Sequence, residues 1–117
     1  MRLGRFLVAV SSVYFAGSVL LYAKDIPYNK KVHLKVGQII VLKGVRSECS
    51  AKVAPSFKEL SRLPKPKFGV LLDGGVGTLF SKNCDRKVPA RAIKFKATKS
   101  GKETISVYDD RVTIRVD

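Results

Sequence analysis

The sequence predicts a small all-β sandwich of about seven short strands with one short helical turn, preceded by an N-terminal signal or anchor helix. Apolar and polar residues alternate along several segments, as they do on strands with one buried face. Turn-forming residues separate these segments about every 8–12 positions, the spacing typical of sandwiches and small barrels. The 117 residues suffice for one such domain, and we expect no second one.

The N-terminus has the pattern of an export segment. Arg2 and Arg5 supply a positive start, residues 6–23 carry no charged side chain, and Lys24 and Asp25 follow at once. A charged start, an apolar middle and a small residue at the end, here Ala23, are typical of a signal peptide. Its removal would leave 94 of the 117 residues.

An uncleaved membrane anchor is the alternative for residues 1–23. The 18 uncharged residues approach the length that spans a bilayer, but Ser11, Ser12, Gly17 and Ser18 dilute their apolar character and favour a signal peptide. In either case the positive start stays in the cytoplasm and the body is exported. The expected location is the periplasm or the extracellular space, or a single-pass anchorage with the domain outside the cytoplasm.

Cys49 and Cys84 are the two cysteines of the chain, and they fit this location. A lone pair in an oxidising compartment usually forms a disulfide. Closing a loop of 35 positions would stabilise the domain by about 3–4 kcal/mol. A redox pair or a metal site is the alternative, but the chain lacks C-x-x-C, and His33 is its single histidine. We therefore expect a structural disulfide and no metal.

The body of the chain reads as a succession of strands. Residues 24–31 are polar and contain Pro27, so we expect a short linker before a sandwich domain that spans residues 32–117. Residues 32–36 alternate strictly, and residues 39–42 form a continuous apolar run that ends at Lys43 and Gly44. Further strands are expected at residues 68–72, 76–80, 93–98, 105–107 and 112–116.

A helical turn and several tight turns interrupt the strands. Ser56 and Glu59 match a capping box, and Pro64 ends the element, which predicts one or two helical turns that cross between the two sheets. The run Asp73-Gly74-Gly75 is expected to be a tight turn, because glycine adopts positive φ without a Cβ penalty. Residues 81–87 read as a polar loop, residues 99–102 as a hairpin loop, and Asp109-Asp110 as a turn.

The C-terminal strands carry a family resemblance. Residues 91–116 read RAIKFKATKSGKETISVYDDRVTIRV. This stretch resembles the end of bacterial immunoglobulin-like domains, which often close with two alternating strands about a glycine turn and a last strand of the V-x-V-x-V kind. The resemblance implies an immunoglobulin-like sandwich, from which this chain differs by having no tryptophan and by its inserted helical turn. It implies no functional residue, because such domains share no common site.

Catalytic motifs are missing from the sequence. A Ser-His-Asp or Cys-His arrangement would have to use His33, a mid-strand residue with no nucleophile beside it. The chain contains no H-E-x-x-H, S-x-x-K or G-x-S-x-G, and the Lys-Ser or Lys-Thr of a phosphate loop does not follow Gly77. We therefore expect a non-enzymatic protein without a cofactor.

The formal charge of +14 is the one positive functional signal. Six basic residues occupy the polar positions of alternating strands, on the side opposite the expected core: His33, Lys35, Lys94, Lys96, Arg111 and Arg115. If neighbouring strands pair in register, these residues form a basic stripe on one or both sheet surfaces, which would attract anionic partners. The alternative is a solvated surface that keeps the protein soluble.

The expected function is therefore a binding or structural role, in which the basic surface contacts an acidic macromolecule or the cell envelope. Nucleic acid is not expected as the native partner, because no aromatic residue is interleaved with the basic positions as a stacking platform. Residues 73–77 and 81–87 are a second candidate contact region, since binding loops lie at the ends of sandwiches. The alternative is a membrane-anchored accessory subunit of a larger envelope complex, with residues 6–23 in contact with the membrane.

Overall fold

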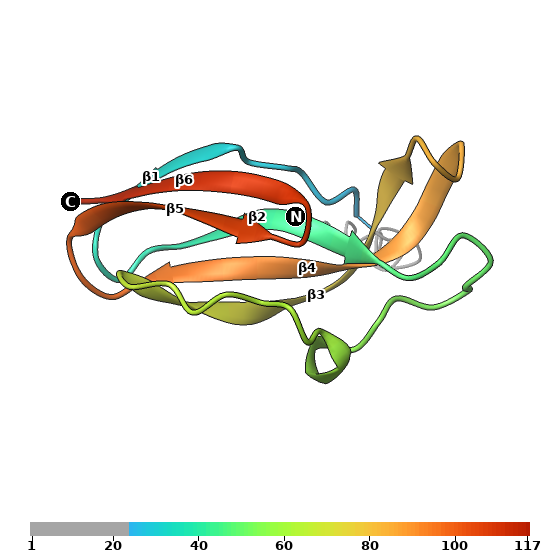
Figure 1. Ribbon diagram of the computed structural model, residues 1–117, viewed down its shortest axis with the longest axis horizontal. Coiled ribbons are helices and arrows are strands. Elements are labelled where there is room, and N and C mark those ends of the chain that lie inside the picture. The colour runs from blue at the N-terminus through green and yellow to red at the C-terminus, as the bar shows by residue number, and fades with distance from the viewer. Residues whose placement is uncertain (1–23) are drawn as a thin grey trace, which may run out of the picture.

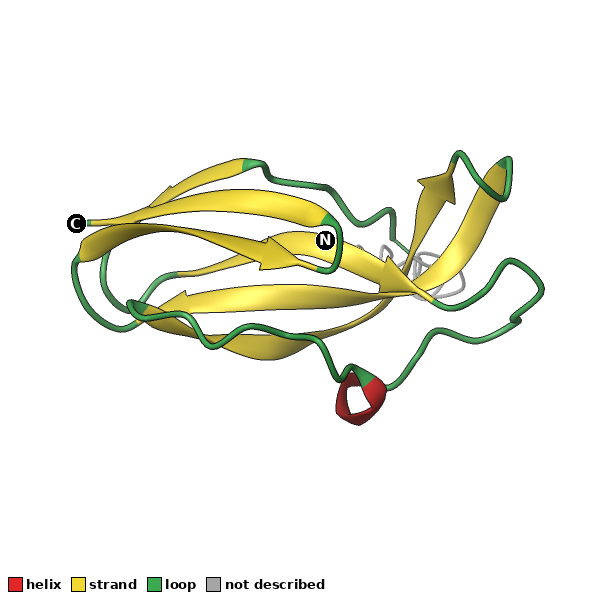
Figure 2. Ribbon diagram, viewed as in Figure 1, coloured by secondary structure: helices red, strands yellow, loops and turns green. Residues whose placement is uncertain are grey.

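The computed structural model describes residues 24–117, and the signal or anchor helix expected in residues 1–23 lies outside them. The described part is mostly β-structure, as predicted, in two sheets of three strands with the orders β1-β6-β5 and β2-β4-β3. Figure 1 shows the two sheets as separate layers, and Figure 2 shows a short helix outside them. The strands are β1 Lys31–Leu34, β2 Ile39–Arg46, β3 Gly69–Ser81, β4 Arg86–Ala97, β5 Gly101–Val107 and β6 Asp110–Val116.

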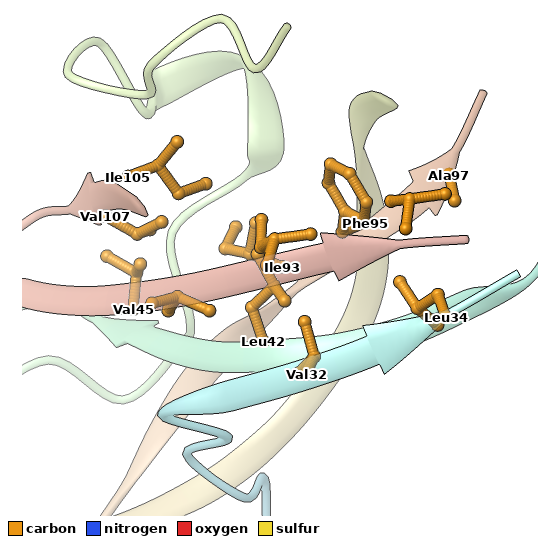
Figure 3. Packing of buried hydrophobic residues seen from close by; sticks show 12 residues of the cluster. Val32, Leu34, Leu42, Val45, Ile93, Phe95, Ala97, Ile105 and Val107 are labelled. Carbon is orange, nitrogen blue, oxygen red and sulfur yellow. The ribbon is translucent and has the colours of Figure 1, made fainter. Parts of the chain in front are cut away.

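The core lies between the two sheets, where inward-facing apolar side chains of both layers meet (Figure 3). Alternate residues of β4 and β6, such as Ile93, Phe95 and Ile114, are fully buried, as the periodicity predicts. Burying one such side chain contributes about 1.5–3 kcal/mol. The cluster contains Val32, Leu34, Leu42, Val45, Ile93, Phe95, Ala97, Ile105, Val107, Val112, Ile114 and Val116.

β3 is one strand of 13 residues where two short strands were expected. Its register with β4 shifts between Asp73 and Val76, so Asp73-Gly74-Gly75 forms a β-bulge and not a turn. Gly75 has a φ of 87°, and its N–H donates to Asp73 Oδ1 at 2.8 Å. The glycines therefore allow the backbone to bend within the strand. The predicted turn is therefore wrong, and the described body has six strands instead of about seven.

The chain reverses at residues 82–85, between β3 and β4. This hairpin extends beyond the core at one end of the molecule (Figure 1). The predicted disulfide between Cys49 and Cys84 is confirmed, with 5.4 Å between the two Cα atoms. It joins the loop that follows β2 to the tip of the hairpin, and the Arg86 guanidinium donates to the Cys49 carbonyl beside it. These contacts fix the hairpin to the loop.

The predicted capping box is confirmed, and it begins a single 3-10 turn, η2, at Phe57–Glu59. The Ser56 N–H donates to Glu59 Oε1 at 2.7 Å, and the Glu59 N–H donates to Ser56 Oγ at 3.3 Å. The pKa of the Glu59 carboxyl is lowered mainly by the hydrogen bond from the Ser56 N–H and further by the one with the Ser56 side chain. Phe57, Leu60 and Leu63 are half-buried against the core. The element connects β2 to β3 of the same sheet, so the predicted crossing between sheets is wrong.

Residues 24–26 lie along β3. The Ile26 N–H donates to the Thr78 carbonyl at 2.7 Å, and the Thr78 N–H donates to the Lys24 carbonyl at 2.8 Å. The Asp25 carboxylate accepts a hydrogen bond from Thr78 Oγ1 at 2.9 Å and pairs with Lys87 Nζ at 3.1 Å. The Lys87 hydrogen bond is the main cause of the lowered pKa of Asp25. The segment thus extends the edge of the sheet at this point.

Residues 26–29 continue across the outer surface of the same sheet to β2. A Cβ on Gly44 or Gly77 would lie 3.2 Å or less from the Ile26 side chain, so both glycines leave the space that Ile26 occupies. At the far edge, the Asn29 N–H donates to the Leu42 carbonyl at 2.8 Å. The stretch expected as a linker therefore makes main-chain hydrogen bonds with both edge strands.

Replacing both cysteines, as Cys49→Ser with Cys84→Ser, removes the cross-link without leaving a free thiol. We expect the free energy of unfolding to fall by about 3 kcal/mol, because the unfolded chain regains the freedom of a loop whose ends lie 35 positions apart. Urea unfolding without reductant measures the difference. An unchanged midpoint, or two free thiols in wild-type protein purified without reductant, would contradict the structural role.

Candidate anion-binding surfaces

The six predicted basic residues lie on two different sheets, in strands or directly beside them. His33, Arg111 and Arg115 belong to β1 and β6, and Lys35 directly follows β1. Lys94 and Lys96 belong to β4 of the other sheet. Each of them alternates with core residues and lies on the opposite side of its sheet, as predicted. They form two outer surfaces on opposite sides of the sandwich and not one stripe.

The outer surface of the β1-β6-β5 sheet is strongly basic. His33 is paired with Arg115, and Arg115 with Lys102 on β5. The next row joins Lys31 to Thr113 and Thr104, and a third joins Arg111 to Ser106. Directly opposed side chains on neighbouring strands lie about 5 Å apart. We call this surface the basic face, and its cationic or titratable residues are Lys31, His33, Lys35, Lys102, Arg111 and Arg115.

Lys31 and Lys102 are two members of the basic face that the sequence analysis missed. Lys31 was assigned to the linker, and Lys102 to a hairpin loop. Both are exposed strand residues. The alternation Lys31-His33-Lys35 and the alternation Lys102-Thr104-Ser106 would have identified them if the expected strands had been extended towards the N-terminus by one and three residues.

Asp117 directly follows β6, and within residues 24–117 it is the one acidic residue whose side chain pairs with residues of the basic face. Its carboxylate lies 2.5 Å from His33 Nε2 and 3.2 Å from Arg115 Nε. The hydrogen bond with His33 is the first cause of the lowered pKa of Asp117, and the one from Arg115 adds to it. The carboxyl therefore stays ionised at neutral pH and offsets part of the charge of Arg115. Lys31, Lys102 and Arg111 make no ion pair with it.

The outer surface of the β2-β4-β3 sheet combines lysines with aliphatic side chains. Lys96 is paired with Ile39 on β2 and Val70 on β3, and Lys94 is paired with Val41 and Leu72 on the same two strands. Ile39 is 51% exposed and Val70 is 44% exposed. We call these six residues the mixed face. Its chemistry differs from that of the basic face, where Thr104, Ser106 and Thr113 lie among the cations.

A groove of about 490 Å³ opens beside the turn between β5 and β6. Its wall contains Lys43, which was expected to end a strand. β2 instead continues to Arg46, past a register irregularity between Val41 and Lys43, so that Lys43 lies opposite the buried Ile93. The Lys43 side chain is 10% exposed, and its ammonium donates to Asp110 Oδ2 at 2.6 Å. Its charge is thus neutralised within the protein.

The turn itself also differs from the expectation. Tyr108 and Asp109 form it, and Asp110 is the first residue of β6. Tyr108 has a φ of 55°, which is uncommon for a residue with a Cβ, and its ring lies 4.4 Å from the Arg62 guanidinium carbon. The groove contains three basic residues (Lys43, Arg46 and Arg62) and three acidic ones (Glu48, Asp109 and Asp110). Because these charges balance, the groove differs in electrostatic character from the basic face and the mixed face.

Of the two predicted contact loops, residues 73–77 are not a loop. They lie within β3, and the Asp73 carboxylate is held by the Arg91 guanidinium at 3.1 Å. Residues 81–87 do form the end of the β3–β4 hairpin, where the disulfide ties Cys84 to the loop after β2. Of the two segments, residues 82–85 within the second are therefore the part that forms a loop.

Comparisons with known proteins add no family to these observations: the chain matches no family model, and no curated protein and no solved structure matches it. Within residues 24–117, no three acidic, histidine or cysteine side chains gather as a metal site would require. Over the same residues, no helix reaches the length and apolar character that a membrane crossing needs.

The ion pair in the groove predicts a specific pattern of stability. Asp110→Ala removes the carboxylate that compensates the poorly exposed Lys43, so we expect the free energy of unfolding to fall by about 1–3 kcal/mol. Lys43→Met in the Asp110→Ala background removes the uncompensated charge and should restore most of the loss. Asp109→Ala, at the exposed neighbouring position, is the control and should change little. Equal losses for Asp109→Ala and Asp110→Ala in urea unfolding would refute this role of the pair.

Proposed function

We propose that this protein is an exported, non-enzymatic binding protein whose basic face contacts an acidic macromolecule outside the cytoplasm. The arrangement of the basic face supports this more than any other observation. β1 with the residue that follows it, β5 and β6 bring five Lys and Arg side chains and His33 to one sheet surface, where Asp117 pairs with His33 and Arg115. A surface of one sign attracts partners of the opposite sign and speeds their encounter.

The rows of the basic face suit a partner with repeated anionic groups. Cations alternate with Thr104, Ser106 and Thr113, whose hydroxyl groups can donate to sulfate, phosphate or carboxylate oxygens. Arg111 and Arg115 can each bind such a group through two parallel N–H donors. Alternate residues on one strand lie about 6.8 Å apart, and neighbouring strands about 4.8 Å apart. A grid of this kind fits an extended anionic polymer, such as an acidic glycan, better than a small ligand.

Two features support export. The confirmed disulfide is consistent with a location outside the cytoplasm. The positive start and the uncharged residues 6–23 have the order of a signal peptide. We further propose an immunoglobulin-like arrangement, which the parallel pairing of β1 with the last strand and the two-sheet packing support. The disulfide departs from the usual pattern of such domains, because it ties a loop to a hairpin tip and does not cross the core.

A membrane-anchored accessory subunit is the second candidate. The observation that favours it is the fixed position of Lys24, which is hydrogen-bonded to β3 directly after the uncharged residues 6–23. A retained anchor would then hold the body in a defined orientation. The intact mass of the protein isolated from its native envelope decides between the two: a chain that begins at Lys24 excludes the anchor, and one that retains Met1 excludes cleavage.

Binding to immobilised heparin, a sulfated glycan, tests the basic face. Lys102→Glu with Arg111→Glu reverses two charges there, and Lys94→Glu with Lys96→Glu makes the same change in net charge on the mixed face. We expect the first pair to elute at clearly lower salt than the wild type, and the second pair to elute close to it. Each variant must keep the wild-type unfolding midpoint. Equal shifts for the two pairs would mean that net charge alone controls binding, and the proposal would be wrong.

A further inference from the structure

We propose that the mixed face rests on the surface of a lipid bilayer that contains anionic lipids. This inference goes beyond the proposed function, which concerns the basic face on the other side of the sandwich. It assigns a second surface and a second partner chemistry to the same small domain. Three observations carry it: the composition of the mixed face, the absence of carboxylates from its rows, and the place where residue 24 joins the body.

The composition of the mixed face is unusual for a sheet surface in water. In the row Ile39–Lys96–Val70 the lysine has an exposed aliphatic neighbour on each side, and Lys94 lies between Val41 and Leu72 in the next row. Solvated sheet surfaces normally present polar side chains at these positions. Contiguous exposed apolar groups mark surfaces that contact a partner or a membrane.

Lysine between aliphatic side chains is the combination that a bilayer surface accepts. The four methylene groups of Lys94 or Lys96 can lie along the neighbouring aliphatic groups while the ammonium extends to the phosphate level. Aliphatic side chains such as Ile39 and Val70 can enter the boundary between headgroups and acyl chains. Anionic lipids attract the ammonium groups, and this attraction sets the orientation of the surface.

Carboxylates do not oppose this contact. The outward positions of the two described rows contain no Asp or Glu. Asp25 lies near, in a groove of about 290 Å³ whose wall also contains Lys24, Val41 and Lys94. Its carboxylate is already bound by Lys87 and Thr78. Two copies of the mixed face would bring lysines against lysines, so a second copy of this chain does not complement it.

The chain enters the described body at this same surface. The Lys24 carbonyl lies over Gly77, where an added Cβ would come within 2.5 Å of it, and Lys24 shares the groove with Lys94. The uncharged residues 6–23 precede Lys24 directly in the sequence. A retained apolar segment would therefore bring the bilayer to the mixed face and leave the basic face pointing away from the membrane.

Tryptophan fluorescence tests the contact, because the chain contains no tryptophan of its own. Val70→Trp places an indole on the mixed face, and Thr104→Trp places a matched one at an exposed position of the basic face. The protein, with the N-terminus it carries in its native envelope, is reconstituted with vesicles of phosphatidylglycerol and phosphatidylcholine whose acyl chains carry bromine. We expect the emission of Val70→Trp to shift to the blue and lose more than half of its intensity, while Thr104→Trp keeps its emission.

Charge reversal tests the role of the lysines. Lys94→Glu with Lys96→Glu in the Val70→Trp background should abolish the quenching. Lys52→Glu with Lys58→Glu, at exposed positions between β2 and β3 that do not line the groove beside Val70, should preserve it. If Val70→Trp does not fold, Ile39→Trp replaces it, because Ile39 is paired with the same lysine from the other side.

Three results would overturn the proposal: no quenching at either mixed-face position, equal quenching on both faces, or quenching that survives reversal of Lys94 and Lys96. A change of the Val70→Trp emission with soluble polyglutamate but not with brominated vesicles would assign the surface to an acidic protein instead. The heparin elution of the Lys102→Glu, Arg111→Glu pair tests the basic face independently. A negative vesicle result therefore does not affect the proposed function of the basic face, and a negative heparin result does not affect the proposal for the mixed face.

Discussion

The alternation of apolar and polar residues along the strands is the constraint on which the rest of the structure depends. Phe95 and Ile93 must reach the core between the sheets, so Lys94 and Lys96 must point outward from the same strand. A shift of one residue would bury the lysines and expose the phenylalanine, which fixes the register. The same rule on β6 turns Arg111 and Arg115 to solvent. These four cations therefore lie on the outer surfaces of the two sheets.

Much of this follows from local sequence. The alternation around Ile93, Ile105 and Ile114 indicated strands that the structure contains, because burial on one face leaves a period of two in the sequence. The capping box at Ser56 and Glu59 is confirmed, since both of its hydrogen bonds are local. Cys49 and Cys84 are the two cysteines of the chain, so no other pairing within it was open to them.

What the sequence does not contain is the pairing of distant segments. Lys96 and Arg115 follow the same alternation, yet they lie on opposite faces, because β4 pairs with β2 and β3 while β6 pairs with β1 and β5. The run Asp73-Gly74-Gly75 would suit a turn or a bulge equally, and the continuous partner strand β4 decides for the bulge. Lys43 follows an apolar run as a strand end would, and two distant acceptors, the Asp110 carboxylate and the Val107 carbonyl, explain why it can be buried.

Two faces of different chemistry are the functional consequence of this partition. The basic face combines cations with hydroxyl groups, as a hydrated polyanion requires, and the mixed face combines cations with aliphatic groups. The central claim is that the basic face binds an anionic polymer. Its most direct test is the change in backbone amide NMR shifts when a short heparin oligosaccharide is added. We expect the largest changes in β1, β5 and β6. Changes spread evenly over both sheets, or confined to β2, β3 and β4, would contradict it.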